Sequence, residues 1–219
     1  MQSPRLAPDN DIAPTFTAPA KGALILLLPP PQTQGMEKGE NMMGAQLDAQ
    51  IRSAGYRAET LPRAEYDRAW SQETAAVGGI FDGNTGALRP EAFTTAMASL
   101  AKKLCEEKKC ALMIRQRLVA RNATLMGYWA EWDGARQMIR LSNESGMDYR
   151  FSGSTAALSV ELLALTGRGG FAFRQIGGAT LPFATNVVEK KSELRRDLFD
   201  SDAEIAGGVR IALAPLTTP

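Results

Sequence analysis

The sequence predicts an α/β (α+β) domain in which helices pack on a mixed, largely antiparallel sheet of about seven strands. Three observations predict this class. An apolar run at 23–28 is followed by apolar residues at helical spacing, which indicates an N-terminal βαβ unit. Beyond residue 111 the apolar period becomes two, and hairpin signals interrupt it. Helical spacing returns near the C-terminus, so a closing helix is expected.

The βαβ unit comes first. The run Ala23–Leu28 is closed by three prolines, and its continuous apolar character predicts a strand that is buried on both faces of the sheet. Apolar residues then recur every four positions within 39–54, which predicts a helix that ends before Gly55. Polar and apolar residues alternate over 56–61, and we expect a second strand there, at a sheet edge.

The region after this unit gives weaker signals. Residues 64–70 predict two helical turns, and a second long helix is expected over Pro90–Lys103, where proline stands at the first helical position. Between them lies the glycine-rich loop Gly78–Gly86. A P-loop would need a Lys-Ser/Thr pair after this loop, and a calcium loop would need a glutamate near the position of Phe93. A structural turn is therefore favoured.

Two cysteines, Cys105 and Cys110, lie where the second long helix passes into the next strand. The chain reverses there, so Cα atoms can approach to about 5.5 Å, the separation that a disulfide needs. We expect the pair to be bridged in an oxidising compartment. Two unlinked thiols are the alternative.

The middle of the chain predicts an antiparallel meander. Leu112–Ile114 begins a buried strand, and 118–131 continues it after a bend or bulge at 115–117. The pair Asp133-Gly134 is a strong signal for a two-residue hairpin turn, which leads into a strand at 136–141.

A second hairpin and a helix complete the prediction. Residues 156–165 and 171–176 form the strands of the hairpin. A helix is expected over Glu193–Leu213, with Ser192 as its N-cap, and the glycines at 207–208 weaken it without ending it.

Composition excludes several classes of function. The chain has 25 basic and 24 acidic side chains, so its net charge of +1 gives little field to attract nucleic acid. It contains no histidine, which excludes Ser-His and Cys-His catalysis and every histidine-containing metal site. Two cysteines are too few for a cysteine-only zinc site. We therefore expect no catalytic residue, metal or cofactor.

The N-terminal region predicts a flexible leader. Residues 1–21 are rich in proline and polar side chains, whereas 22–219 have the composition of a single α/β domain. The leader is interpreted as the start of an exported protein whose signal has been removed, and a native cytosolic tail is the alternative.

The segments "ALILLLPP", "RSAGYRAETL" and "CALMIRQRLVARNATLMGYWAEWDG", followed by two hairpins and a helix, resemble the TolB N-terminal-like domain. That domain occurs in outer-membrane lipoproteins related to the curli-secretion channel subunit and to lipoprotein activators of penicillin-binding proteins. The resemblance is architectural, covers residues 22–214 and implies a non-enzymatic assembly factor or channel subunit. The lipid-bearing N-terminal cysteine of the family is absent, as expected only if this chain starts after it.

Basic and aromatic residues indicate a surface for a partner. Five of them are its predicted binding residues: Arg115, Arg117, Arg121, Trp129 and Trp132. Guanidinium groups and indole rings suit a carboxylate-bearing glycan or an acidic protein patch, with Tyr128, Arg136 and Arg140 nearby. The alternative is a solvated sheet face with exposed arginines and ordinary core tryptophans.

These observations predict a binding or assembly module of the bacterial cell envelope. We expect a periplasmic protein, anchored at the outer membrane through a lost lipid anchor, that contacts an envelope protein, peptidoglycan-linked machinery or a second copy of itself, and no nucleic acid. The alternative is a cytosolic α/β enzyme or nucleotide-binding protein that uses the Gly78–Gly86 loop.

Overall fold

The computed structural model describes residues 10–142, 150–186 and 191–217. Its main sheet has eight strands, six of them in the order β1-β8-β7-β4-β2-β3, with β5 added to β4 and β6 added to β5. A second sheet pairs β9 with β10. The strands are β1 (Asp11–Ile12), β2 (Leu24–Leu27), β3 (Arg57–Thr60), β4 (Leu112–Gly127), β5 (Trp129–Trp132), β6 (Ala135–Met138), β7 (Phe151–Thr166), β8 (Phe171–Thr180), β9 (Phe183–Asn186) and β10 (Lys191–Leu194). The helices are α1 (Glu37–Ser53), α2 (Arg63–Ala76), α3 (Pro90–Lys108), α4 (Asp202–Ala212) and α5 (Ala214–Thr217).

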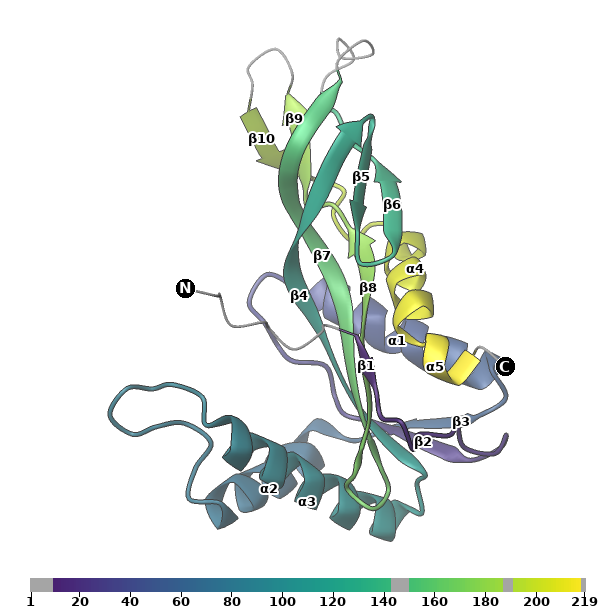
Figure 1. Ribbon diagram of the computed structural model, residues 1–219, viewed down its shortest axis with the longest axis vertical. Coiled ribbons are helices and arrows are strands. Elements are labelled where there is room, and N and C mark those ends of the chain that lie inside the picture. Colours follow the sequence, from purple (N-terminus) through teal and green to yellow (C-terminus); the bar gives the residue numbers. More distant parts are fainter. Residues whose placement is uncertain (1–9, 143–149, 187–190, 218–219) are drawn as a thin grey trace.

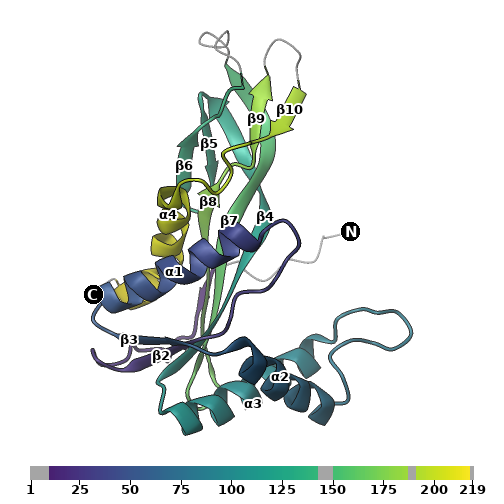
Figure 2. The same cartoon turned by 180° about the vertical axis from the view of Figure 1, so that it is seen from behind.

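The predicted fold class is confirmed, with eight strands in the main sheet. Helices α1 and α4 cover one face of the sheet, and the pair α2–α3 lies against the other face at one end (Figures 1 and 2). Strand β2 has apolar side chains on both faces of the sheet, so helices must pack on both faces to bury them. Ile25 and Leu27 belong to the core under α1 and α4, whereas Leu24 and Leu26 belong to the core under α2 and α3. The prediction of a strand buried on both faces is therefore confirmed.

The N-terminal βαβ unit forms as predicted. Strand β2 pairs in parallel with β3 and with β4, and β3 lies at the sheet edge. Helix α1 buries Met43, Leu47 and Ile51, which share one face because four residues make about one helical turn. Gly55 follows the helix with a φ of 86°, a conformation that favours glycine.

The long hairpin of β4 and β7 is regular. The two strands pair residue by residue from Leu112 opposite Thr166 to Gly127 opposite Phe151, without a register shift. Of the bend or bulge predicted at 115–117, the bulge is therefore absent. Polar side chains interrupt the apolar pattern there, but they occupy regular strand positions in which neighbours point to opposite faces.

The turn at Asp133 and Gly134 is confirmed. Both residues have positive φ, 40° and 76°, as a two-residue turn of type I′ requires, and they join β5 to β6. The Gly178 N–H donates to Asp133 O at 2.9 Å, so the hairpin curls back toward β8. A separate apolar cluster that includes Ala123, Ala130 and Trp132 fills the space enclosed by these strands.

The C-terminal helix is shorter than predicted. Residues 191–194 form β10, and α4 begins only after Ser201, whose side chain accepts a hydrogen bond from the Ala203 N–H. The predicted start at Ser192 and Glu193 is therefore wrong. The reason is tertiary: Arg195 is 8% exposed and bonds to groups on other elements, which fixes a non-helical path. The glycines do not end α4, and Gly208 lets the helix approach Gly177 of β8 closely.

The ordered chain begins before residue 22. Asp11 and Ile12 pair with β8, and the ring of Phe16 contacts that of Phe173 edge to face, 5.5 Å between centroids. Residues 10–21, part of the predicted flexible leader, therefore include segments that pack on the sheet. Residues 1–9 lie outside the described residues.

Candidate functional site

The predicted binding arginines lie on β4. Arg115, Arg117 and Arg121 occupy positions separated by even numbers, so they share the face of β4 opposite to the α1 and α4 side. We call these three residues the arginine row. Arg136 and Arg140 do not join them, because they pair with Glu131 and Glu204 instead.

Arg117 is held by a buried carboxylate that sequence analysis did not identify. Its Nε and Nη2 atoms donate to Glu161 at 2.8 and 3.0 Å, and Arg174 of β8 donates to the same carboxylate at 2.8 Å. The Glu161 side chain is 5% exposed. Burial raises the pKa of this carboxyl, but the hydrogen bonds from the two arginines outweigh burial and hold the pKa below its ordinary value. Glu161 therefore stays ionised at neutral pH.

Arg121 is engaged in a second network. Its Nε and Nη2 donate to Asp133 at 3.0 and 3.2 Å, and Ser159 Oγ donates to Asp133 at 2.7 Å. The Asp133 side chain is 14% exposed. Arg117 and Arg121 are therefore both paired, because Glu161 of β7 neutralises the first and Asp133 of the β5–β6 turn neutralises the second.

Arg115 differs from its two neighbours. Its guanidinium lies 5.4 Å from the centroid of the Phe93 ring of α3. Among the described residues, no hydrogen bond or ion pair of Arg115 is found. Burial lowers the pKa of Arg115, and the charge of Arg117 lowers it further. The arginine row therefore contains one half-buried cation that makes no direct contact with an acid in the described residues.

The two predicted tryptophans lie elsewhere. Trp132 is 6% exposed and its Nε1 donates to Leu158 O at 3.2 Å, so it is a core residue. Trp129 is half-buried, stands in register with Met126 and Met138, and has Arg136 4.6 Å from its ring centroid. Both methionines are 60% exposed, which leaves an apolar strip across β4, β5 and β6.

One segment of β4 lacks a neighbouring strand. On the side away from β7, β2 pairs only with residues 112–114 and β5 only with 124–126. Within the described chain, no strand pairs with this side of 115–123, which we call the open edge. Leu28 N–H donates to Ile114 O, so Ile114 directs its backbone toward that side. Every second residue after Ile114 directs its backbone N–H and C=O groups to the same side, away from β7. These residues are Gln116, Leu118, Ala120 and Asn122.

The open edge is accessible over part of its length. The Gln116 side chain donates to Leu28 O at 3.1 Å and covers the first residues. Ala120 and Asn122 are exposed. The accessible part is therefore the segment that also carries Arg121.

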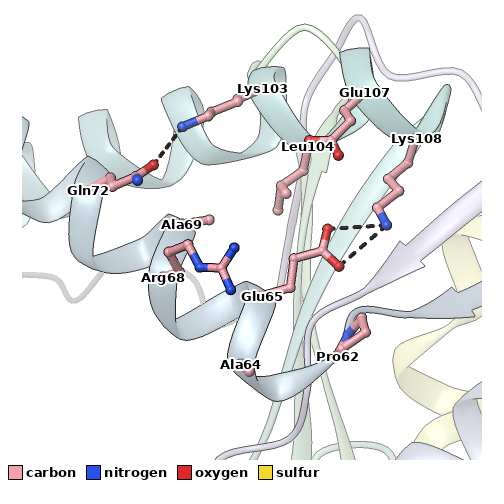
Figure 3. Close-up of a pocket in the computed structure, with 10 residues that line it drawn as sticks. All are labelled: Pro62, Ala64, Glu65, Arg68, Ala69, Gln72, Lys103, Leu104, Glu107 and Lys108. Atoms are coloured by element: carbon pink, nitrogen blue, oxygen red, sulfur yellow. Dashed lines mark hydrogen bonds and ion pairs between the residues drawn. The ribbon is translucent and has the colours of Figure 1, made fainter.

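A groove of about 550 Å³ lies between α2 and α3 (Figure 3). Both of its lysines are engaged: Lys108 contacts Glu65 at 3.1 Å, and Lys103 donates to Gln72 at 2.9 Å. The hydrogen bond to Glu65 raises the pKa of Lys108, so this lysine keeps its proton and is a poor nucleophile. The described lining of the groove offers no nucleophile with an adjacent base.

The Gly78–Gly86 loop forms a tight turn. One oxygen of Asp82 accepts hydrogen bonds from the N–H groups of Asn84 and Thr85, at 3.1 and 2.8 Å. Arg89 donates to the carbonyls at 78 and 79. The polar groups of the loop are thus used internally, which supports a structural turn.

The cysteines are joined in the structure. Cys105 and Cys110 form a disulfide with Cα atoms 4.5 Å apart, across the left-handed residue Lys109 that ends α3. Both are buried, at 4% and 8% exposure.

Clusters of metal-ligating side chains and membrane-spanning helices are both absent from the described residues. In that part of the chain no group of three or more Cys, Asp and Glu side chains could hold a metal ion. Across 10–142, 150–186 and 191–217, no helix has the length and apolar character needed to cross a bilayer.

Comparison with known proteins gives two weak structural similarities. No family model matches the chain, and no curated protein matches it. A PelC dodecamer from Paraburkholderia phytofirmans is similar at a TM-score of 0.43 and 8% identity, covering 93% of this chain and 94% of that one. A variant of the same PelC dodecamer gives 0.41 and 8%, covering 94% and 96%. These structures are named PelC and not TolB, and at this similarity they assign no residue role to this chain.

Glu161, Arg174 and the position of the open edge were not predicted from the sequence. Glu161 had a signal, because it is the only acid within the apolar strand 156–165. Its pairing with Arg117 depends on the register of two strands, which the sequence pattern leaves undefined.

Proposed function

We propose that the protein is a non-enzymatic binding or assembly module of the bacterial cell envelope that contacts a protein partner through the open edge of β4. The observation that carries this proposal is the lack of a neighbouring strand along 115–123, between β2 and β5. Unpaired backbone N–H and C=O groups at a sheet edge can accept an added strand from another chain.

The dimensions of the open edge support strand addition. Four alternate residues from Gln116 to Asn122 direct their backbone groups outward, and β5 continues the same edge from Thr124. An incoming strand would therefore pair with β4 in the gap between β2 and β5, which already pair with β4 on the same side. Because adjacent strands lie about 4.8 Å apart, its side chains would stand beside Arg117, Val119 and Arg121.

The disulfide supports the envelope location. Cysteine pairs of this kind persist in oxidising compartments such as the periplasm and are rare in the cytosol. We propose that the protein is periplasmic and attached to the outer membrane through a lipid anchor. Its partner is an envelope protein, a component of peptidoglycan-linked machinery or a second copy.

The test combines a crosslinker with a proline. A photoreactive amino acid at Asn122, in protein exported to the periplasm of the source cells, should give a defined protein adduct. Ala120→Pro should abolish this adduct, because proline removes an outward N–H while the pairing with β7 remains. Ala120→Val keeps the N–H and should retain the adduct.

Two controls make the result decisive. The same crosslinker at Lys102, exposed on α3, should give no matching adduct. Circular dichroism should show that Ala120→Pro is folded. An adduct that survives Ala120→Pro, or that forms equally from Lys102, would refute binding at the open edge.

A further inference from the structure

The surroundings of Arg115 contain more positive than negative charge. Three guanidinium groups, those of Arg115, Arg117 and Arg174, lie on this face of the sheet with two carboxylates, those of Glu161 and of Asp11, which stands opposite Arg174. Glu161 already accepts hydrogen bonds from Arg117 and Arg174. Arg115, the third cation, makes no hydrogen bond or ion pair among the described residues, and the charge of Glu161 acts on it only at longer range.

Leaving such a charge unpaired is costly. A half-buried cation loses part of its hydration, and a second cation nearby adds repulsion. The lowered pKa of Arg115 has these two causes. An anion bound at this place would relieve both.

The contact with Phe93 fixes how an anion would bind. The aromatic ring occupies one face of the Arg115 guanidinium, at 5.4 Å, which leaves the N–H groups free at the edge of the planar group. Phe93 is itself held edge to face against Trp70, 5.8 Å between centroids. The edge of a guanidinium matches a planar carboxylate with two parallel hydrogen bonds.

We infer that Arg115, held on the ring of Phe93 and assisted by Arg117, is a binding site for a carboxylate group of a ligand. This inference goes beyond the proposed function and does not depend on strand addition. The carboxylate would make two hydrogen bonds to Arg115 and a longer-range contact to Arg117, whose Nε and Nη2 remain on Glu161.

Nuclear magnetic resonance of the arginine Nε–Hε groups tests the site at constant ionic strength. One probe is glutamate capped as N-acetyl N-methylamide, the form of an acidic side chain in a protein. The second is galacturonate, a carboxylated sugar. At least one should shift the Arg115 resonance saturably, and the difference between them shows which source of carboxylate the site prefers. The capped glutamine, which lacks the charge, should give no shift.

Variants decide whether Arg115 is responsible. Arg115→Gln should abolish the saturable shifts of neighbouring resonances, and Arg115→Lys, which keeps the charge and loses the planar fork, should weaken binding about tenfold. Arg68→Gln, at an exposed arginine of α2, is the matched control and should bind like the unaltered protein. If Arg115→Gln fails to fold, the weaker binding expected for Arg115→Lys decides whether Arg115 is responsible.

Three results would overturn the inference. These are no saturable shift with either carboxylate, the same shift in the Arg115→Lys variant and in the unaltered protein, or stronger binding of inorganic phosphate than of both carboxylates. The last result would replace a carboxylate site with a phosphate site.

Discussion

Replacing Arg117 by Glu should destabilise the fold strongly, because Arg117 is paired with a buried carboxylate. The substitution removes two hydrogen bonds, of 2.8 and 3.0 Å, from a Glu161 side chain that is 5% exposed. Removing one member of a buried ion pair costs about 3–5 kcal/mol. Arg174 still contacts Glu161, so we expect a loss in the free energy of unfolding at the low end of this range, about 3 kcal/mol. The negative charge of the introduced glutamate would repel Glu161 and prevent the two side chains from forming a new contact.

Urea unfolding followed by circular dichroism measures this loss. The midpoint should fall while the slope stays unchanged, and the melting temperature should drop by roughly 6–12 °C for a chain of this size. Arg136→Glu is the control, because Arg136 pairs with Glu131 at the surface, with side chains 59% and 45% exposed. It should change the free energy of unfolding by no more than about 0.5 kcal/mol. A loss for Arg117→Glu as small as that of the control would refute the buried network.

Four further predictions use other parts of the structure. Arg195→Met should lower the free energy of unfolding by about 3 kcal/mol in urea, since it leaves the half-buried Glu204 without its main cation; a loss near zero would contradict this. Burial raises the pKa of Glu204, but the hydrogen bonds to its carboxylate outweigh burial, so the pKa lies below the ordinary value of 4.5. The stability that the Glu204 carboxylate contributes is therefore fully present above pH 4.5 and is lost as the pH falls through the lowered pKa. Stability measured down to about pH 3 should decline less steeply in Glu204→Gln, and equal slopes would refute the assignment. Deleting residues 1–20 should cost more stability than deleting 1–9, by about 1–2 kcal/mol, because it removes β1 and the Phe16 contact; equal melting temperatures would show that this segment adds nothing. Protein exported to the periplasm should gain mass on alkylation only after reduction, and opening the Cys105–Cys110 loop should cost about 2 kcal/mol; free thiols before reduction would remove this support for export.

The elements that were predicted well have local causes. The apolar run of β2 stops at prolines that cannot continue a ladder, and α1 follows from a four-residue apolar repeat. The turn at Asp133 and Gly134 needs two positive φ angles, which these residue types adopt readily. In each case residues close in the sequence contain the whole physical reason, so a pattern is sufficient to predict the element.

The errors have tertiary causes. Residues 193–201 have apolar spacing that suits a helix, yet Arg195 bonds to Leu181 O and to Glu204 and keeps the segment non-helical. Charged hydrogen bonds in a buried place are worth more than the few tenths of a kcal/mol per residue by which helix propensities differ. Propensity alone therefore overestimates the helix.

The candidate site shows the same division. The sequence by itself determined that Arg115, Arg117 and Arg121 share one face of a strand, because side chains alternate along any strand. Only the tertiary structure decided that Glu161 neutralises Arg117, that Asp133 neutralises Arg121 and that Arg115 is left on Phe93. The tertiary structure also decided that β2 and β5 pair only with the two ends of β4, which leaves the edge between them open. Alternation is a property of a single strand, whereas ion pairs and open edges depend on which strands meet and in what register, and that is fixed by packing between residues far apart in the sequence.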